Sequence, residues 1–292
     1  MANFRLGLIG YPLGHSLSPK IHGAALKACG LQGDYSLFPI HPNDKQGLKG
    51  LLARVCSGEI TGLNVTIPHK QNVIELMDEL TPTAKAIGAV NTIYFRNNKL
   101  IGDNTDAQGF LSDLKLFLTL ECNSSLSHIQ EQAPALQKNV LILGAGGSAR
   151  AVVYALLNDG WNVSIVARRI EQAQQLVVAL TNHELRITDS ISNLELSNIV
   201  LIVNTTPIGM APKTDQSPLP ENLSLPSNIL IYDLVYNPHE TKLVKDARSQ
   251  GLIATTGLGM LIEQAALAFE IWTGYNPPRE IMRAAIEQIS NL

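Results

Sequence analysis

A glycine-rich turn at residues 144–149 is the clearest place for chemistry in this 292-residue chain. It consists of Gly144, Ala145, Gly146, Gly147, Ser148 and Ala149. In a G-x-G-x-x-G/A turn the first glycine permits the tight bend, the second lets backbone N–H groups approach a pyrophosphate, and the third small residue brings helix against strand. An apolar run at 139–143 precedes the turn and a helical pattern at 148–159 follows it, so an ordinary strand-to-helix turn is the weaker interpretation. The sequence therefore predicts a dinucleotide site here.

Two arginines follow the second strand of this series, where a dinucleotide site selects its cofactor. About 20 residues after the glycines, an NAD site usually offers an Asp or Glu to the ribose, whereas an NADP site offers Arg to the 2′-phosphate. This chain has Arg168 and Arg169 there, and guanidinium groups bind phosphate through charge-assisted hydrogen bonds. NADP is therefore favoured. The alternative is that both arginines are solvated, with Glu171 close enough to pair with one of them.

Small polar side chains gather at the ends of predicted strands in the first half of the chain, where α/β sheets bind ligands. An oxidoreductase that moves a hydride needs a group that exchanges the hydroxyl proton. The candidates are Ser16, Ser18, Asn64, Thr66, Lys70, Asn91, Thr105 and Asp106. Plain structural interpretations also exist: Ser18 and Asp106 as helix caps, Lys70 as a solvated lysine, Asn91 as a turn residue. The seven histidines occur singly, so no metal site is predicted.

The elements that must position these groups alternate between strand and helix, which predicts an α/β fold with mainly parallel sheets covered by helices. Ser18 is expected to be the N-cap of the first helix, with Pro19 at its first position. In the first third we expect strands at 4–10, 34–40 and 62–67, helices at 18–30, 43–58 and 72–80, and a hairpin at 91–104 that turns at Asn97-Asn98.

A second alternating series begins at Asn139, after a predicted helix at 106–120 and a polar surface loop at 121–138. We expect strands at 139–143, 162–167, 199–204, 228–235 and 252–256, and helices at 148–159 and 170–181. Two such series imply two sheets. Helices are also expected at 260–274 and 278–292, and periodicity does not decide which sheet they cover.

Composition excludes several function classes. Hydrophobic residues make up 45% and charged residues 16% of the chain, which is typical of a globular protein. The net charge is −3 without long runs of one sign, so the expected partner is a small molecule rather than nucleic acid or a membrane surface. The three cysteines are widely spaced, no apolar run reaches the ~20 residues that span a bilayer, and the opening residues suit a strand better than a signal sequence. These features predict a cytoplasmic protein.

Eight ordered motifs resemble those of the shikimate dehydrogenase family, over essentially the whole chain. They are GxPxxHSLSPxxH at 10–22, GLNVTIPHK at 62–70, GAVNT at 88–92, GDNTDxxG at 102–109, GAGGSAR at 144–150, NTTPIGM at 204–210, YNP at 236–238 and GLGMLIEQA at 257–265. The resemblance implies an enzyme of aromatic amino acid biosynthesis that reduces 3-dehydroshikimate to shikimate with NADPH.

The resemblance also implies roles for individual residues. Lys70 and Asp106 would be the catalytic pair, with Lys70 donating the proton to the C3 oxygen and Asp106 orienting it; whether Lys70 is itself the acid or mainly polarises the oxygen stays open. The substrate carboxylate would be bound by Ser16, Ser18 and Tyr236, and the ring hydroxyls by Asn64, Thr66, Asn91 and Gln264. The residues flanking the ribose and nicotinamide would be Asn204, Thr205, Met210, Leu234, Gly257 and Met260.

The family fold implies a discontinuous substrate-binding domain, residues 1–107 plus 257–292, a Rossmann NADP-binding domain, residues 108–256, and a reaction cleft between them. A monomer and a homodimer are both compatible with it. Where the family has Asn-Arg-Thr after the second Rossmann strand, this chain has Ala167-Arg168-Arg169, which exchanges an adenine-ribose contact for a second positive charge.

Three functions stay open at this point. An NADP-dependent shikimate dehydrogenase is favoured by serine at both carboxylate positions. A quinate/shikimate dehydrogenase able to use NAD is the second. The third is a catalytically silent NADP-binding regulator, against which the presence of Lys70 and Asp106 counts.

Overall fold

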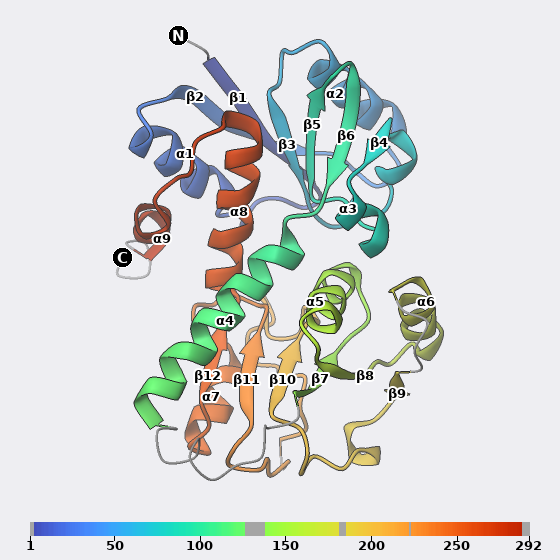
Figure 1. Ribbon diagram of the computed structural model, residues 1–292, viewed down its shortest axis with the longest axis vertical. Coiled ribbons are helices and arrows are strands. Elements are labelled where there is room, and N and C mark those ends of the chain that lie inside the picture. The colour runs from blue at the N-terminus through green and yellow to red at the C-terminus, as the bar shows by residue number, and fades with distance from the viewer. Residues whose placement is uncertain (1–2, 126–137, 181–184, 222, 288–292) are drawn as a thin grey trace. The chain divides into compact units, whose positions relative to one another are not determined.

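The structure is a computed structural model that describes residues 3–125, 138–180, 185–221 and 223–287, with only the backbone described for 121–125. The chain divides into two compact units (Figure 1). Unit 1 contains residues 1–109 and 262–292, and unit 2 contains residues 110–261. The sequence-based division placed the corresponding boundaries at 107/108 and 256/257.

Unit 1 is built on a mixed six-stranded sheet of order β2-β1-β3-β5-β6-β4. The β1–β2, β1–β3 and β4–β6 pairs are parallel, and β5 pairs antiparallel with both β3 and β6. The strands are β1 (Asn3–Gly10), β2 (Gln32–Pro39), β3 (Gly62–Val65), β4 (Glu79–Leu80), β5 (Thr92–Arg96) and β6 (Lys99–Asp103). The helices are α1 (Ser18–Ala28), α2 (Lys45–Cys56), the 3-10 helix η1 (Ile74–Leu76), α3 (Pro82–Ile87) and α9 (Arg279–Glu287).

Two local patterns form as the sequence predicts. The predicted apolar face of α2 is buried, and Asp44 caps the helix by accepting a hydrogen bond of 2.8 Å from Gly47 N–H. The buried residues are Leu48, Leu51, Leu52 and Val55. Asn97 and Asn98 have φ values of +53° and +59°, the left-handed conformation that a tight two-residue hairpin needs, and they join β5 to β6.

Two local predictions were wrong. Ser18 is not the N-cap of α1, because Leu17 occupies that position, and Leu17 has no side chain that could cap the helix. The helix predicted at 72–80 is replaced by η1 and β4. The reason is a sheet edge: Asp78 exchanges backbone and side-chain hydrogen bonds with Leu100, and Thr81 then starts α3 by capping Ala84 N–H.

Unit 2 contains a fully parallel six-stranded sheet of order β12-β11-β10-β7-β8-β9, the doubly wound arrangement of a dinucleotide-binding domain. The strands are β7 (Asn139–Leu143), β8 (Asn162–Val166), β9 (Arg186–Thr188), β10 (Leu201–Asn204), β11 (Leu230–Asp233) and β12 (Ala254–Thr256). The helices are α5 (Gly147–Asn158), α6 (Ile170–Leu180), the 3-10 helix η2 (Ile191–Asn193) and α7 (Lys242–Ser249). The prediction of two mainly parallel sheets is confirmed.

The chain passes between the units within two helices, α4 (Asp106–Ser125) and α8 (Leu258–Thr273). The helix predicted at 106–120 therefore continues to Ser125, and the rest of the loop predicted at 121–138 lies, up to residue 137, outside the described residues. Each unit has its own apolar core. In unit 1 it surrounds Leu63 and Ile93 of the sheet, and in unit 2 it surrounds Leu141 and Ile202.

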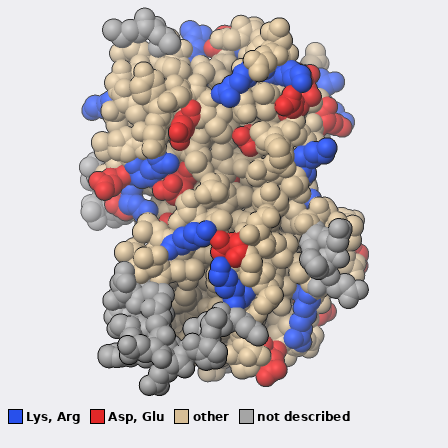
Figure 2. All heavy atoms as spheres, in the orientation of Figure 1, with Lys and Arg blue, Asp and Glu red and all other residues tan. Residues whose placement is uncertain are grey.

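The surface carries no strong field of one sign on the face that Figure 2 shows. Among the residues described there, basic and acidic side chains are interspersed within a larger uncharged area. A nucleic acid needs a continuous basic patch or stripe, and this face does not offer one. Within the described part of the chain, the helices are too short or too polar to cross a bilayer.

Candidate active site

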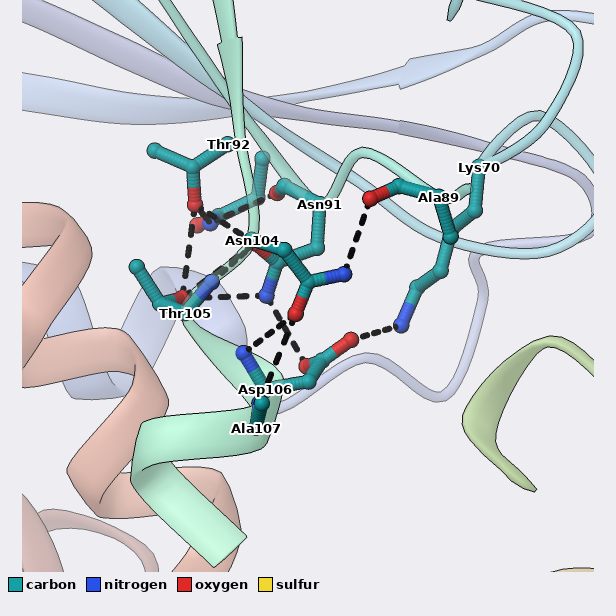
Figure 3. Close-up of polar contacts among 9 residues, drawn as sticks. Lys70, Ala89, Asn91, Thr92, Asn104, Thr105, Asp106 and Ala107 are labelled. Carbon is teal, nitrogen blue, oxygen red and sulfur yellow. Dashed lines mark hydrogen bonds and ion pairs between the residues drawn. The ribbon is translucent and has the colours of Figure 1, made fainter. Parts of the chain in front are cut away.

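Lys70 and Asp106 form an ion pair in unit 1 (Figure 3). Lys70 Nζ lies 2.7 Å from Asp106 Oδ2, and the two side chains are only 15% and 8% exposed. Lys70 lies in the loop after β3, and its carbonyl accepts a hydrogen bond of 2.8 Å from Val90 N–H. The lysine is therefore held between two strand ends. A largely buried, charge-assisted pair of this kind is ordered, and the exposed part of Lys70 is still reachable by a ligand. The interpretation of Lys70 as a solvated lysine is wrong.

Asp106 is placed by the residue two positions before it. Asn104 Oδ1 accepts hydrogen bonds from the backbone N–H groups of Asp106 and Ala107, so Asn104 caps α4, and Asn104 Nδ2 donates to the Ala89 carbonyl at 3.0 Å. The alternative interpretation of Asp106 as only a helix cap is therefore wrong. Its carboxylate lies in the first turn of α4, where the helix dipole favours negative charge, and is left to bind side chains.

Asn91 orients the second oxygen of this carboxylate. Asn91 Nδ2 donates to Asp106 Oδ1 at 2.8 Å and to Thr105 Oγ1 at 3.0 Å, and Asn91 Oδ1 accepts from Thr105 N–H at 2.8 Å and from Thr92 Oγ1 at 2.9 Å. Both amide hydrogens and the amide oxygen are thus engaged, and Asn91 is 2% exposed. Asn91 does more than complete a turn, because it fixes the rotamer of Asp106 (Figure 3).

Asn64 is the next member of the network. Its amide nitrogen donates to the Asn91 carbonyl at 3.2 Å, and its amide oxygen accepts from the Tyr35 hydroxyl at 2.8 Å. Thr66 follows on the same segment, and its backbone N–H donates to the Ile9 carbonyl at 2.8 Å. The loop after β3 is therefore pinned to the end of β1.

The two serines lie at the start of α1. Ser16 Oγ accepts a hydrogen bond of 3.3 Å from Ser18 N–H, which leaves the Ser16 hydroxyl hydrogen available to a ligand. Ser18 does not cap α1, so its hydroxyl is not committed to the first N–H groups of the helix. Both serines stand at a helix N-terminus, a position that favours a carboxylate.

Gln264 is brought to the helix of Asp106 by close backbone packing. A Cβ on Gly109 would lie 2.7 Å from the Gln264 backbone nitrogen, so only glycine allows α4 and α8 to approach this closely. Unit 1 thus joins Lys70, Asp106, Asn91 and Asn64 by hydrogen bonds and adds Gln264 by packing.

The glycine turn of unit 2 has the geometry that a pyrophosphate requires. Gly144 has φ +102°, and a Cβ there would lie 2.8 Å from Thr206 Cγ2, so this position needs glycine. At Gly146 and Gly147 an added Cβ would meet no atom within 4 Å, which leaves open space in front of the turn. No side chain caps α5, so its first N–H groups are available to an anion. The residues present therefore fit a dinucleotide phosphate.

Arg168 and Arg169 follow β8 and are both exposed. Within the described part of the chain neither arginine forms an ion pair, with Glu171 or with any other acid. Arg150, at the start of α5, is half-buried, and burial lowers its pKa. The two exposed guanidinium groups remain available to a phosphate group.

The other predicted cofactor residues divide into two groups. Asn204 is buried and donates to Asp233 Oδ1 at 2.8 Å, while Thr205 Oγ1 donates to the Leu143 carbonyl at 2.7 Å, so both side chains are bonded within the protein. In the second group, Leu234 packs so closely against Gly257 that a Cβ added there would collide with the Leu234 carbonyl oxygen. Met210 is exposed and Met260 is buried.

Two side chains of unit 2, Tyr236 and Asp233, have raised pKa values. Burial raises the pKa of Tyr236, so its hydroxyl stays protonated and can donate a hydrogen bond. Burial also raises the pKa of Asp233 to about 6, although Thr241, Val235 N–H and Asn204 donate hydrogen bonds to it and oppose the rise.

Comparison with known proteins identifies the family. The family model of the shikimate dehydrogenase substrate binding domain matches residues 8–93, that of shikimate / quinate 5-dehydrogenase matches 127–234, and that of the shikimate 5'-dehydrogenase C-terminal domain matches 257–287. The shikimate dehydrogenase (NADP(+)) of Methanococcus maripaludis strain C6 is 38% identical to this chain, over 96% of the chain and 95% of the relative. The chain belongs to the shikimate dehydrogenase family.

Solved members of the shikimate dehydrogenase family have the same fold. The shikimate 5-dehydrogenase of Thermus thermophilus, solved in complex with NADP(H) and shikimate, has a TM-score of 0.82 and 35% identity, covering 98% of this chain and 99% of its own. The quinate dehydrogenase of Corynebacterium glutamicum, solved in complex with NAD, has a TM-score of 0.83 and 30% identity. The match covers 98% of this chain and 100% of that protein. The family prediction and the two-domain α/β fold are confirmed.

Sequence reasoning missed three residues of the candidate site. Asn104 caps the helix of Asp106, Thr92 completes the bonds of Asn91, and Tyr35 binds Asn64. The signal for Asn104 was present, because Asn two residues before a helical run is a capping pattern. No local pattern indicates the contact between Tyr35 and Asn64, which lie 29 residues apart.

Proposed function

We propose that this protein is an NADP-dependent shikimate dehydrogenase that reversibly reduces 3-dehydroshikimate to shikimate in the pathway to the aromatic amino acids. One observation carries the proposal: the ordered, partly exposed Lys70–Asp106 pair lies at strand ends in the unit that the substrate-binding family model matches. A protonated amine held by a carboxylate is the group that a carbonyl oxygen needs while it becomes a hydroxyl. The presence of this Lys70–Asp106 pair also argues against a catalytically silent cofactor-binding regulator.

The chain's own groups manage the proton and the orientation of the substrate. The chemistry that NADPH supplies when bound is hydride donation to the carbonyl carbon. Lys70 Nζ gives its proton to the carbonyl oxygen as the C–H bond forms, and the neutral amine later takes a proton from solvent. Asp106 holds the amine through Oδ2 while Asn91 holds Oδ1, so the carboxylate does not rotate away.

Substrate recognition is assigned to hydroxyl and amide groups. Ser16 and Ser18 are proposed to donate hydrogen bonds to the substrate carboxylate at the start of α1, where the helix dipole adds to the attraction. The ring hydroxyls are assigned to Asn64, Thr66, Asn91 and Gln264, and Tyr236 to the carboxylate edge.

Cofactor selection is assigned to the turn of Gly144–Ala149 and to Arg168 and Arg169. The open space at Gly146 and the uncapped start of α5 suit the pyrophosphate, and two exposed guanidinium groups suit a 2′-phosphate better than a free ribose hydroxyl. Asn204, Thr205, Met210, Leu234, Gly257 and Met260 are proposed to shape the nicotinamide end.

A turnover assay tests the proposal. The purified protein is mixed with NADP⁺ and either shikimate or quinate, and the reduced cofactor is followed by absorbance; NAD⁺ replaces NADP⁺ in a second series. We expect turnover with shikimate and NADP⁺, and much weaker turnover with quinate or with NAD⁺. Equal rates on shikimate and quinate would favour a quinate/shikimate dehydrogenase, and no turnover on either would refute the proposal.

The proposal extends to the state of the protein in the cell. We infer a monomer or homodimer that works on small molecules in the cytoplasm, in keeping with the widely spaced cysteines and the mixed surface charge. Light scattering measures the mass in solution, and cell fractionation measures the location. A larger assembly or a membrane-bound fraction would contradict this part.

A further inference from the structure

Tyr35 crosses one face of the unit 1 sheet to reach the substrate-binding network. In the strand register Tyr35 of β2 stands opposite Leu6 of β1, and Asn64 of β3 stands opposite Leu8. Residues two apart along a strand share a face, so Tyr35 and Asn64 lie on the same face with β1 between them. The Tyr35 hydroxyl spans that distance and donates to Asn64 Oδ1 at 2.8 Å.

Aromatic packing fixes the plane of the Tyr35 ring. The His22 ring of α1 lies parallel to it, with centroids 4.4 Å apart and an interplanar angle of 4°. The rings of Trp272 and Phe269 in α8 also pack against the His22 ring, with centroids 5.5 and 6.3 Å from it. A Cβ on Gly62 would collide with Trp272 Nε1, so the indole rests directly on the sheet backbone. The phenol therefore has one orientation.

The direction of each hydrogen bond follows from Asn64. Its Nδ2 must donate to the Asn91 carbonyl, because a carbonyl oxygen only accepts. Asn64 Oδ1 therefore faces Tyr35, and the phenol must donate its only hydrogen to that oxygen.

Burial raises the pKa of Tyr35, so the phenol stays protonated and keeps its hydrogen on Asn64. Tyr35 thus supports a group assigned to the substrate, the amide of Asn64.

We propose that Tyr35 is a positioning residue for shikimate, which holds the Asn64 amide in the geometry that binds a ring hydroxyl of the substrate. Tyr35 does not itself donate to the substrate, since its hydrogen is committed to Asn64. The assignment rests on the proposed function. It adds to that function a residue whose removal weakens substrate binding while leaving proton transfer at Lys70 in place.

Tyr35→Phe removes one oxygen and keeps the aromatic stack. We expect the KM for shikimate, and the Kd measured by calorimetry, to rise about tenfold, the effect of losing one partly buried hydrogen-bonding group. The kcat is expected to stay within about threefold and the KM for NADP⁺ to stay unchanged, because Lys70, Asp106 and unit 2 are untouched. A shikimate KM within twofold of wild type, or equal rises in both KM values, would overturn the assignment.

Tyr232→Phe is the matched control. Tyr232 is a fully buried phenol of unit 2 that donates to Asp113 Oδ2 at 2.5 Å, so its replacement by Phe also removes a buried hydrogen bond. We expect a lower unfolding temperature from both variants, but a raised shikimate KM from Y35F alone. If Y232F raises the shikimate KM as much, the effect is general destabilisation and the assignment fails.

A double-mutant cycle with Asn64→Ala separates positioning from a merely structural role. If Tyr35 acts through Asn64, the shikimate Kd of Y35F/N64A is weaker than that of N64A by clearly less than tenfold. Full additivity contradicts the assignment. If Y35F does not fold, p-aminophenylalanine is placed at position 35, since its N–H keeps Asn64 bonded. A shikimate Kd within about threefold of wild type is then expected, and a tenfold rise overturns the assignment.

Failure of the assignment is distinguishable from failure of the proposed function. Wild-type protein that does not turn over shikimate refutes the function, and the role of Tyr35 falls with it. Active wild type with an unchanged Y35F refutes the role of Tyr35 alone.

Discussion

Asn91 and Lys70 hold opposite oxygens of one carboxylate. Asn91 Nδ2 bonds Asp106 Oδ1 at 2.8 Å, and Lys70 Nζ bonds Asp106 Oδ2 at 2.7 Å. A carboxylate bound at both oxygens has no free rotation about its last bond, so the ammonium group is held at one place. The side chain assigned to proton transfer therefore needs little rearrangement when the substrate arrives.

Replacing Lys70 tests this arrangement directly. Lys70→Ala is expected to lower kcat by a factor on the order of 10² to 10⁴, the range for a lost general acid, with the KM for NADPH nearly unchanged. Steady-state kinetics of 3-dehydroshikimate reduction provide the measurement. Lys99→Ala is the control, because Lys99 is an exposed lysine of the same unit that also pairs with an acid, Glu79. Full activity in K70A would exclude its catalytic role.

The glycine turn offers a pair of variants that separate folding from cofactor binding. Gly146→Ala adds a methyl group to open space at an ordinary backbone conformation, so we expect an unchanged unfolding temperature and a KM for NADPH raised about tenfold or more. Gly144 has φ +102°, and the added Cβ of Gly144→Ala would collide with Thr205 and Thr206, so we expect a loss of stability of about 1 to 3 kcal/mol. Thermal unfolding and cofactor titration distinguish the two. An unaltered NADPH affinity in G146A speaks against a phosphate at this turn.

Arg168 is expected to select the cofactor. Arg168→Asp should raise the KM for NADPH and lower that for NADH, because a carboxylate repels the 2′-phosphate and accepts hydrogen bonds from ribose hydroxyls. Comparing kcat/KM with the two cofactors gives the result. Glu171→Gln is the control for a purely local ion pair and should leave both values unchanged. If R168D changes neither KM, Arg168 is a surface residue.

His22 makes the stability of unit 1 sensitive to acid. Burial lowers the pKa of His22 from 6.5 to about 3, against a weaker opposing interaction with Asn64, and neither ring nitrogen has a hydrogen-bond partner among the described residues. The unfolded chain therefore binds a proton between pH 6.5 and about 3 that the folded chain does not. The contribution to the unfolding free energy is complete above pH 6.5 and falls through this window, by roughly 5 kcal/mol in total at 1.36 kcal/mol per pKa unit.

Denaturant unfolding at a series of pH values measures this dependence. His22→Phe keeps an aromatic ring in the stack and should flatten the fall in unfolding free energy below pH 6.5 relative to wild type. His41→Asn is the control, because His41 is exposed; the unfolding free energy of this variant should fall with pH as steeply as that of the wild type. Parallel curves for wild type and H22F would mean that His22 is not the group that titrates.

Short-range patterns accounted for a large part of the molecule. The strand–turn–helix at Gly144–Ala149 and the hairpin at Asn97-Asn98 were predictable because each depends on a few neighbouring residues with unusual backbone freedom. The alternation of strands and helices predicted two mainly parallel sheets, since a buried parallel strand must be covered by the helix that follows it.

Some errors came from competition between local and distant partners. Residues 72–80 have a helical pattern, yet Asp78 bonds Leu100 and Glu79–Leu80 pair with β6. Pairing with the edge of the sheet stabilises these residues more than a short, isolated helix would. Ser18 has the residue type of an N-cap, but Leu17 takes the N-cap position, so the helix starts one residue earlier. Residue type alone does not settle which of two adjacent positions starts a helix.

By itself the sequence determined the fold class, the glycine turn, the arginines beside it and the motif positions of Lys70 and Asp106. Only the tertiary structure decided what each polar side chain bonds. Asn91 is committed to Asp106, Asn104 to the start of α4, and Tyr35 to Asn64. The physical reason is that a turn needs only adjacent residues, whereas a buried amide or phenol must find its partner on whichever strand the sheet places beside it.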